Sequence, residues 1–225
     1  MEGPGRRLRK TEIAEALTQT GVVASIQASG EQRLCRVVAA LTNGGIQAIE
    51  LAYATLQSAG RLIPKLKENR VLVGVGALTR SSQARESCMF GADFVTAAVI
   101  SPDVVSACEE MDMPCTLSAL TPTEFWRAHE MKADFVKIVS VEALGGPHYV
   151  RYLRETLPAQ RLMVGEVSLD SYLPYLEAGV EVFEFKSSLA LPGLIEREEW
   201  AEISRRASKI VNTRDNWRAS RKQHT

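Results

Sequence analysis

The chain has 225 residues, with 27 Lys and Arg balancing 27 Asp and Glu, so its formal net charge at pH 7 is zero. Hydrophobic residues make up 45% of it, which is typical of a globular domain, and the balanced charge provides no overall field to attract nucleic acid or an anionic membrane. No apolar run approaches the roughly 18 residues of a membrane-spanning helix, and no apolar segment follows the basic N-terminus as in a secretory signal. We therefore expect a cytoplasmic protein with no nucleic-acid or membrane partner.

Short apolar runs that resemble β-strands recur along the whole chain. They span residues 22–26, 46–51, 71–75, 94–97, 114–117, 135–139, 162–164 and 180–185. Their starts are separated by about 18–27 residues, which is enough for a strand, a helix and two short loops. This regular spacing favours one repeated βα unit.

Helical patterns fill the intervals, for example at 31–42, 81–90, 104–111 and 168–178, and several end at a glycine stop. Strand and helix alternating eight times predicts an α/β fold, a single-domain (β/α)₈ TIM barrel. We expect the barrel to span residues 11–211. Residues 1–10 and 212–225 are expected to be basic, solvated tails.

Lys137 lies in the middle of the sixth apolar run. Alternation places it on the same face as Phe135 and Val139, so we expect it to point into the barrel. Desolvation would lower the pKa of a lysine there, which would favour the free amine that forms a Schiff base with a ketone. A buried ion pair, or a side chain reaching out of the strand end, would explain the same position without catalysis.

Glu50 has the same character near the end of the second run, where it shares a face with Ala48 and Ala52. A carboxylate at this place could take and return protons beside Lys137. It could equally serve only as the counter-ion of the lysine.

Around these two residues the chain resembles the 2-keto-3-deoxy-6-phosphogluconate / 4-hydroxy-2-oxoglutarate aldolase family, and the resemblance covers about residues 8–204. The matching segments are 45–51, 73–76, 91–94, 135–138 and 142–146. The resemblance implies a class I aldolase on a (β/α)₈ barrel that needs no metal or other cofactor and assembles as a homotrimer. It further implies that Lys137 is the Schiff-base residue and Glu50 the general acid/base.

Several substrate contacts of that family are replaced in this chain. The substrate-facing arginine that follows the glutamate motif is Ala54 here, and a threonine that would hold the pyruvyl carboxylate is Ala77. The segments after the fourth and sixth strands, 96–98 and 139–140, also depart from the family pattern. The usual phosphorylated sugar acid is therefore an unexpected substrate.

The mouth of the barrel near strands seven and eight is altered as well. The family binds phosphate there with glycine turns, where this chain has Gly165-Glu166 and Lys186-Ser187. Gly165, Lys186 and Ser187 are our candidates for substrate binding. Lys186 could replace the lost donors or pair with Glu166 or Glu184, and we expect the pair, which would withhold the lysine from phosphate.

Two functions remain open from the sequence. The first is a class I lyase for aldol cleavage or decarboxylation of a small 2-oxo acid such as 4-hydroxy-2-oxoglutarate or oxaloacetate, yielding pyruvate. No spacing of the histidines or cysteines points to a metal site. The second is a non-catalytic aldolase homologue that serves as a binding or assembly protein. The replaced contacts favour the second function, whereas Lys137 and Glu50 favour the first.

Overall fold

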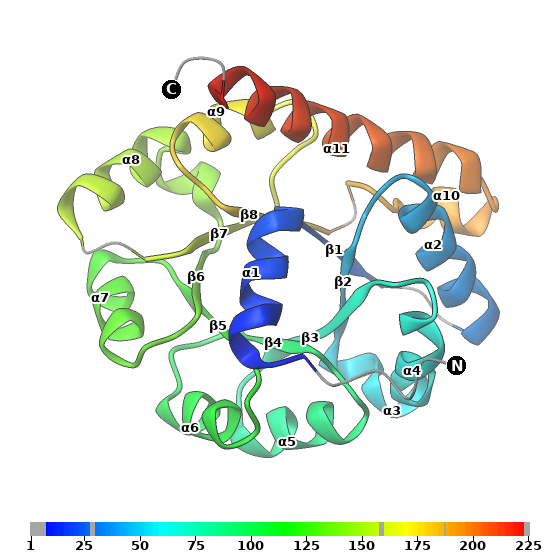
Figure 1. The fold of residues 1–225 in the computed structure, drawn as a ribbon, viewed down its shortest axis with the longest axis horizontal. Coiled ribbons are helices and arrows are strands. Elements are labelled where there is room, and N and C mark those ends of the chain that lie inside the picture. Colours follow the sequence, from blue (N-terminus) through cyan, green and yellow to red (C-terminus); the bar gives the residue numbers. More distant parts are fainter. Residues whose placement is uncertain (1–7, 28–29, 158–159, 187, 223–225) are drawn as a thin grey trace.

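Eight parallel strands close into a barrel in chain order, and the last strand hydrogen-bonds to the first (Figure 1). The computed structural model describes residues 8–27, 30–157, 160–186 and 188–222. The strands are β1 (Val22–Ile26), β2 (Ala48–Ala52), β3 (Leu72–Leu78), β4 (Phe94–Ala97), β5 (Cys115–Ala119), β6 (Phe135–Ile138), β7 (Leu162–Gly165) and β8 (Val182–Phe185). Every apolar run predicted as a strand is a strand, which confirms the single-domain (β/α)₈ barrel.

Helices form an outer layer around the strands, as Figure 1 shows. They are α2 (Glu31–Asn43), α3 (Leu56–Ala59), α4 (Ile63–Lys67), α5 (Ser81–Met89), α6 (Pro102–Glu110), α7 (Pro122–Glu130), α8 (Pro147–Thr156), α9 (Tyr172–Glu177), α10 (Pro192–Glu196) and α11 (Trp200–Lys222), with short 3₁₀ segments η1 (Tyr53–Thr55), η2 (Gly60–Leu62) and η3 (Val141–Leu144). Helices α6 and α7 begin with a side chain that caps the first turn and with a proline at the first helical position. At α7, the Thr121 hydroxyl accepts the Glu124 N–H, Glu124 reaches back to the Thr121 N–H, and Pro122 opens the first turn. Within the described residues, no helix is both long and apolar enough to cross a bilayer.

Helix α1 (Lys10–Thr20) lies across one end of the barrel, in front of the strands in Figure 1. Its apolar face packs against inward-pointing side chains from the first halves of the strands. This inner cluster contains Ile13, Ala14, Leu17, Val23, Ala48, Phe94, Phe135, Met163 and Val182. Because α1 seals this end, the opposite end, where the strands have their carboxyl termini, is left for a site.

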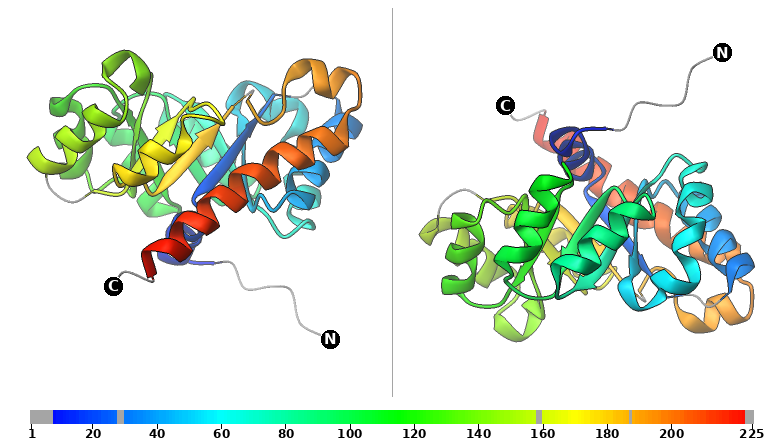
Figure 2. Two further views of the ribbon diagram at one scale, coloured as in Figure 1. Left: turned by 90° about the horizontal axis from the view of Figure 1, so that it is seen from above. Right: turned by 90° about the horizontal axis from the view of Figure 1, so that it is seen from below.

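The expected basic tail at the C-terminus is wrong for residues 212–222, which continue α11. Figure 2 shows the end of α11 beside α1 in both views. There Arg214 donates to the carbonyl of Thr20, and Arg218 donates to the carbonyls of Thr18 and Gln19. These guanidinium groups satisfy carbonyls at the C-terminus of α1, where cations also favour the helix dipole.

The expected N-terminal tail differs as well, because α1 already begins at Lys10. Lys10 forms an ion pair with Asp134, at 3.2 Å, and another with Glu109. Residues 1–7 and 223–225 of the two expected tails lie outside the described residues.

Arg214→Ala is expected to lower the free energy of unfolding by about 1–3 kcal/mol, because a buried carbonyl at the end of α1 loses its charged donor. Urea denaturation measures this change. Lys209→Ala is the matched control on the same helix, since the Lys209–Asp170 pair is exposed and should contribute less than about 1 kcal/mol. Equal effects of the two substitutions would contradict a capping role for Arg214.

Candidate active site

A pocket of about 200 Å³ opens at the carboxyl ends of the strands. Its lining comes from strands or strand ends on nearly every side of the barrel: Ser25, Gln27, Glu50, Ala52, Gly76, Ala77, Ala98, Ser118, Lys137, Val139, Glu184 and Lys186. Both residues singled out from the sequence for catalysis, Lys137 and Glu50, are therefore in one pocket. Such a position at the C-terminal face of a (β/α)₈ barrel is where its enzymes carry out chemistry.

Lys137 points into the barrel from β6, as alternation predicted, while Val136 and Ile138 pack in the outer core. The residue is only 7% exposed, and its Nζ donates to Glu184 Oε2 at 2.8 Å. The two residues come from β6 and β8, so their contact passes over β7. Gly165 leaves room for this contact, because a Cβ there would lie tightly against Glu184 Oε2, at 3.1 Å, and in ordinary contact with Lys137 Cδ, at 3.6 Å.

Glu50 enters the same pocket from β2 and is 4% exposed. Its Oε2 accepts a hydrogen bond of 2.5 Å from the hydroxyl of Thr96 on β4. Gly76 on β3 leaves room for the carboxylate, because a Cβ there would stand 2.0 Å from Glu50 Oε1. The following residue, Ala77, has a φ of +64° where β3 loses its regular register with β4, so a bulge shapes this wall.

The expected lowering of the Lys137 pKa is wrong. Burial does lower it, but the negative charges of Glu50 and Glu184 outweigh burial, and the pKa lies above the ordinary lysine value. The pKa of the Glu50 carboxyl group lies above that of an ordinary glutamate. Burial and the charge of Glu184 raise its pKa to about 7, against the opposing effects of Lys137 and Thr96. The resting pocket thus holds a lysine ammonium beside a carboxyl group that titrates near neutral pH.

We expect kcat/KM to rise with pH through a midpoint near 7, because the ionised form of Glu50, whose pKa is about 7, must accept a proton. Glu50→Gln should remove this limb and lower kcat by roughly 10²–10⁴-fold. A pH profile of each protein checks this. An unchanged acid limb in Glu50→Gln would show that another group titrates there.

At the rim of the pocket Lys186 forms an ion pair with Glu166, which confirms that this lysine is tied to a glutamate. Both side chains are about half exposed, so the pair is more solvated than expected. Glu166 adopts a left-handed φ of +65°, and its N–H donates to the carbonyl of Glu184 at 3.1 Å. That N–H is therefore occupied. Ser187, a third binding candidate, lies outside the described residues.

From the sequence, Glu184 was expected only as a possible partner of Lys186. In the structure its carboxylate accepts a hydrogen bond from Lys137 instead. Alternation along β8 indicates that Glu184 points into the barrel, since Val182 belongs to the inner cluster and Glu184 lies two residues further, but it does not give the pairing with Lys137. Gly165, which was expected to bind substrate, lies next to the Lys137–Glu184 pair.

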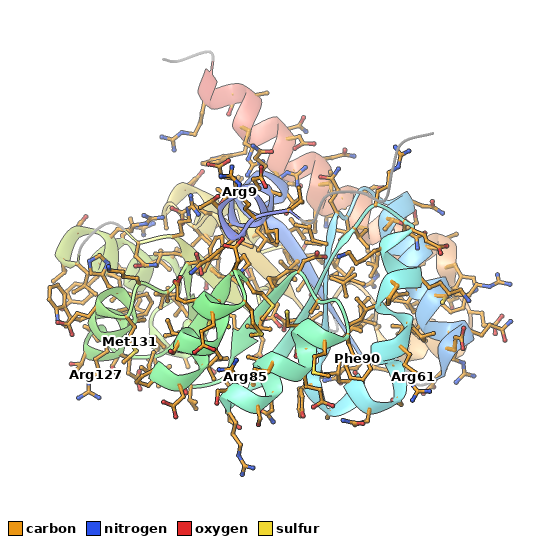
Figure 3. The ribbon with its side chains drawn as sticks, turned by 60° about the horizontal axis from the view of Figure 1, so that its bottom comes forward. Arg9, Arg61, Arg85, Phe90, Arg127 and Met131 are labelled. Atoms are coloured by element: carbon orange, nitrogen blue, oxygen red, sulfur yellow. The ribbon has the colours of Figure 1, made fainter. Side chains whose placement is uncertain are left out.

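The described part of the pocket lining contains no arginine, and its cations are Lys137 and Lys186. Figure 3 places the labelled Arg61, Arg85 and Arg127 on the outer helical layer. Among the described residues, no three His, Cys, Asp or Glu side chains gather closely enough to hold a metal ion. The groups of the described lining that can exchange protons or act as nucleophiles are its lysines, its carboxylates and its hydroxyl groups.

Comparison with known proteins decides the family, because the family model for KDPG and KHG aldolase matches residues 13–206. The chain belongs to this family. It is 24% identical to the 2-dehydro-3-deoxy-phosphogluconate aldolase of Haemophilus influenzae over 204 residues, which covers 89% of this chain and 96% of the relative. The corresponding Treponema pallidum enzyme is 28% identical over 166 residues, or 73% of this chain and 79% of the relative.

A solved structure with the same fold is the KDPG aldolase of Legionella pneumophila, with pyruvate captured at low pH as a covalent carbinolamine intermediate. It aligns with a TM-score of 0.81 and 18% identity, covering 89% of this chain and 98% of that one. Membership of the aldolase family makes this chain a lyase of that family. The alternative of a non-catalytic homologue finds no support in these comparisons.

Proposed function

We propose that this aldolase is a class I lyase in which Lys137 forms a Schiff base with a small, unphosphorylated 2-oxo acid and Glu50 moves the protons. The observation that carries the proposal is the buried Lys137 in a pocket with a carboxyl group whose pKa is about 7. That value lets Glu50 both accept and return a proton near neutral pH. The carbinolamine captured in the Legionella relative supports the same chemistry.

The steps follow from these groups. The Lys137 ammonium passes a proton to Glu50, and the amine attacks the ketone carbon to give a carbinolamine. Glu50 returns the proton to the carbinolamine hydroxyl, which leaves as water, so a protonated imine forms and Glu50 is ionised again. The imine withdraws electrons while the bond between C3 and C4 breaks. In a retro-aldol reaction Glu50 takes the proton of the C4 hydroxyl, and an aldehyde leaves. In a decarboxylation carbon dioxide leaves instead. Protonation of the enamine and hydrolysis then release pyruvate and regenerate the lysine.

The polar groups left for the substrate are mainly uncharged. Ser25 and Gln27 line the pocket from the end of β1, and Ser118 lines it from β5. Ser25 and Gln27 can hydrogen-bond the carboxylate of a small acid. The Ser118 hydroxyl already donates to the Ala97 carbonyl at 2.7 Å, and Lys186 is paired with Glu166. We therefore favour 4-hydroxy-2-oxoglutarate or oxaloacetate as the substrate.

Borohydride trapping tests the proposal. The wild-type protein is mixed with pyruvate, with glyoxylate plus pyruvate, or with oxaloacetate, then reduced, and its intact mass is measured. A stable adduct on Lys137 is expected, and Lys186→Ala should still form it. If no ketone gives an adduct, the catalytic function fails and a non-catalytic binding or assembly protein becomes the better explanation.

Turnover of 4-hydroxy-2-oxoglutarate is expected to exceed that of the phosphorylated six-carbon substrate. The rim carries Glu166, which would repel a dianion, and the Glu166 N–H is bound to the Glu184 carbonyl. Comparing kcat/KM for the two compounds decides it. A clear preference for the phosphorylated compound, or a structure with phosphate held by Gly165, Lys186 and Ser187, would contradict this prediction.

The proposal includes the homotrimer that the family resemblance implies, and the cytoplasmic location expected from the sequence. Light scattering at micromolar concentration tests the oligomeric state, and a monomer would contradict this part of the proposal.

A further inference from the structure

Glu184 is the most deeply buried charged side chain of the pocket, at 1% exposure. Its Oε2 accepts a hydrogen bond from Lys137 Nζ at 2.8 Å. Its flanking strands bring Ser25 from β1 and Gly165 from β7 to the same region, and neither residue carries a charge. A buried carboxylate in such surroundings is stable only with its partner, so Glu184 and Lys137 act as a unit.

We infer that Glu184 is a second catalytic carboxylate, the fixed counter-ion that stays bonded to Lys137 Nζ through the whole reaction while Glu50 carries the protons. The inference rests on the proposed Schiff-base function and adds a residue to it.

Atom and charge balance explain why a fixed counter-ion fits this nitrogen. The lysine ammonium and the ketone combine to give a protonated imine and one water, so Nζ goes from three hydrogens to one and keeps its positive charge. The remaining N–H can still donate to Glu184. A carboxylate placed there therefore keeps a cationic partner in both the resting and the imine state.

Glu50 is arranged differently. Its hydrogen bond goes to Thr96, and its pKa of about 7 lets it change charge during the reaction. The two carboxylates thus have different roles. Glu184 is hydrogen-bonded to the reacting nitrogen, and Glu50 has a pKa suited to exchanging protons.

Removal of the Glu184 charge should destabilise both cations on Nζ. The charged groups that act on Lys137 are Glu50, Glu184 and, more weakly, Glu166, while Lys186 lies in the same lining. With Glu184→Gln, free amine should form at lower pH, and the imine should lose its proton at lower pH. The whole pH profile of imine trapping should therefore move down.

The experiment measures the rate of adduct formation with pyruvate and cyanoborohydride, which reduces the protonated imine, between about pH 5 and 10. For Glu184→Gln we expect both limbs to shift down by about one pH unit or more. Glu184→Asp, which keeps the charge at a longer distance, should shift less. Glu177→Gln, an exposed carboxylate on α9, is the matched control and should follow wild type.

Thermal unfolding checks the fold of each variant, and if Glu184→Gln does not fold, Glu184→Asp decides with the smaller downward shift. A folded Glu184 variant that traps pyruvate with the wild-type profile would overturn this inference while leaving the proposed function intact. Absence of an adduct in the wild-type protein would overturn both.

Discussion

Lys137→Ala should abolish the borohydride-stable adduct and lower kcat/KM by about 10⁴-fold or more, because the variant lacks the amine that forms the imine. Intact-mass measurement after trapping and a pyruvate-release assay report the two losses. Lys186→Ala is the matched control, since this lysine lines the same pocket but is exposed and paired with Glu166. It should retain the adduct.

The Lys137→Ala variant also leaves Glu184 buried without a cation, which on its own costs several kcal/mol of stability unless the carboxyl group takes up a proton. Circular dichroism and thermal unfolding must therefore show a folded protein before the activity is interpreted. Retention of the adduct by folded Lys137→Ala would place the Schiff base on a different lysine.

Gly76→Ala should lower kcat by roughly 10²-fold with a smaller effect on KM, because the new methyl group would stand 2.0 Å from Glu50 Oε1 and must displace the carboxylate. Such a displacement moves the proton-transfer group without changing its chemistry. Steady-state kinetics measures the split between kcat and KM. The acid limb of the pH profile should move too, since the surroundings that set the Glu50 pKa have changed.

Gly193→Ala is the control for this substitution. Gly193 lies on α10, and a Cβ there would approach only the flexible end of the Arg197 side chain, 3.2 Å away. Its kinetics should match wild type. Full activity with a wild-type pH profile in Gly76→Ala would mean that the position of Glu50 is not critical.

The fold could be predicted because each strand carries its own local signal. The run around Val73 and the run around Val136 are both buried on two sides, as the strands of a parallel barrel must be, and their spacing leaves room for one helix. Alternation also oriented Lys137 and Glu50 correctly, since it depends only on neighbouring residues.

The pairing of Lys137 with Glu184 could not be obtained in the same way. It depends on β7 presenting Gly165 between the two side chains, a contact that exists only when the sheet curves into a barrel. The direction of the Lys137 pKa was wrong for this reason, because burial alone was considered without the second carboxylate. The last turns of α11 were missed because polar contacts of Arg214 and Arg218 hold them in place of an apolar stripe.

The contacts of Arg214 and Arg218 join residues that are 194 and 200 positions apart, and the strand that completes the barrel, β8, pairs with the first strand, β1. Until β8 pairs with β1, a folding chain therefore carries a sheet with two unpaired edges. Such long-range closure also slows folding, because the chain loses the entropy of bringing its ends together before the contacts between them can form. The interval before β8 joins β1 is therefore the stage of folding at which exposed strand edges can pair most readily with other chains.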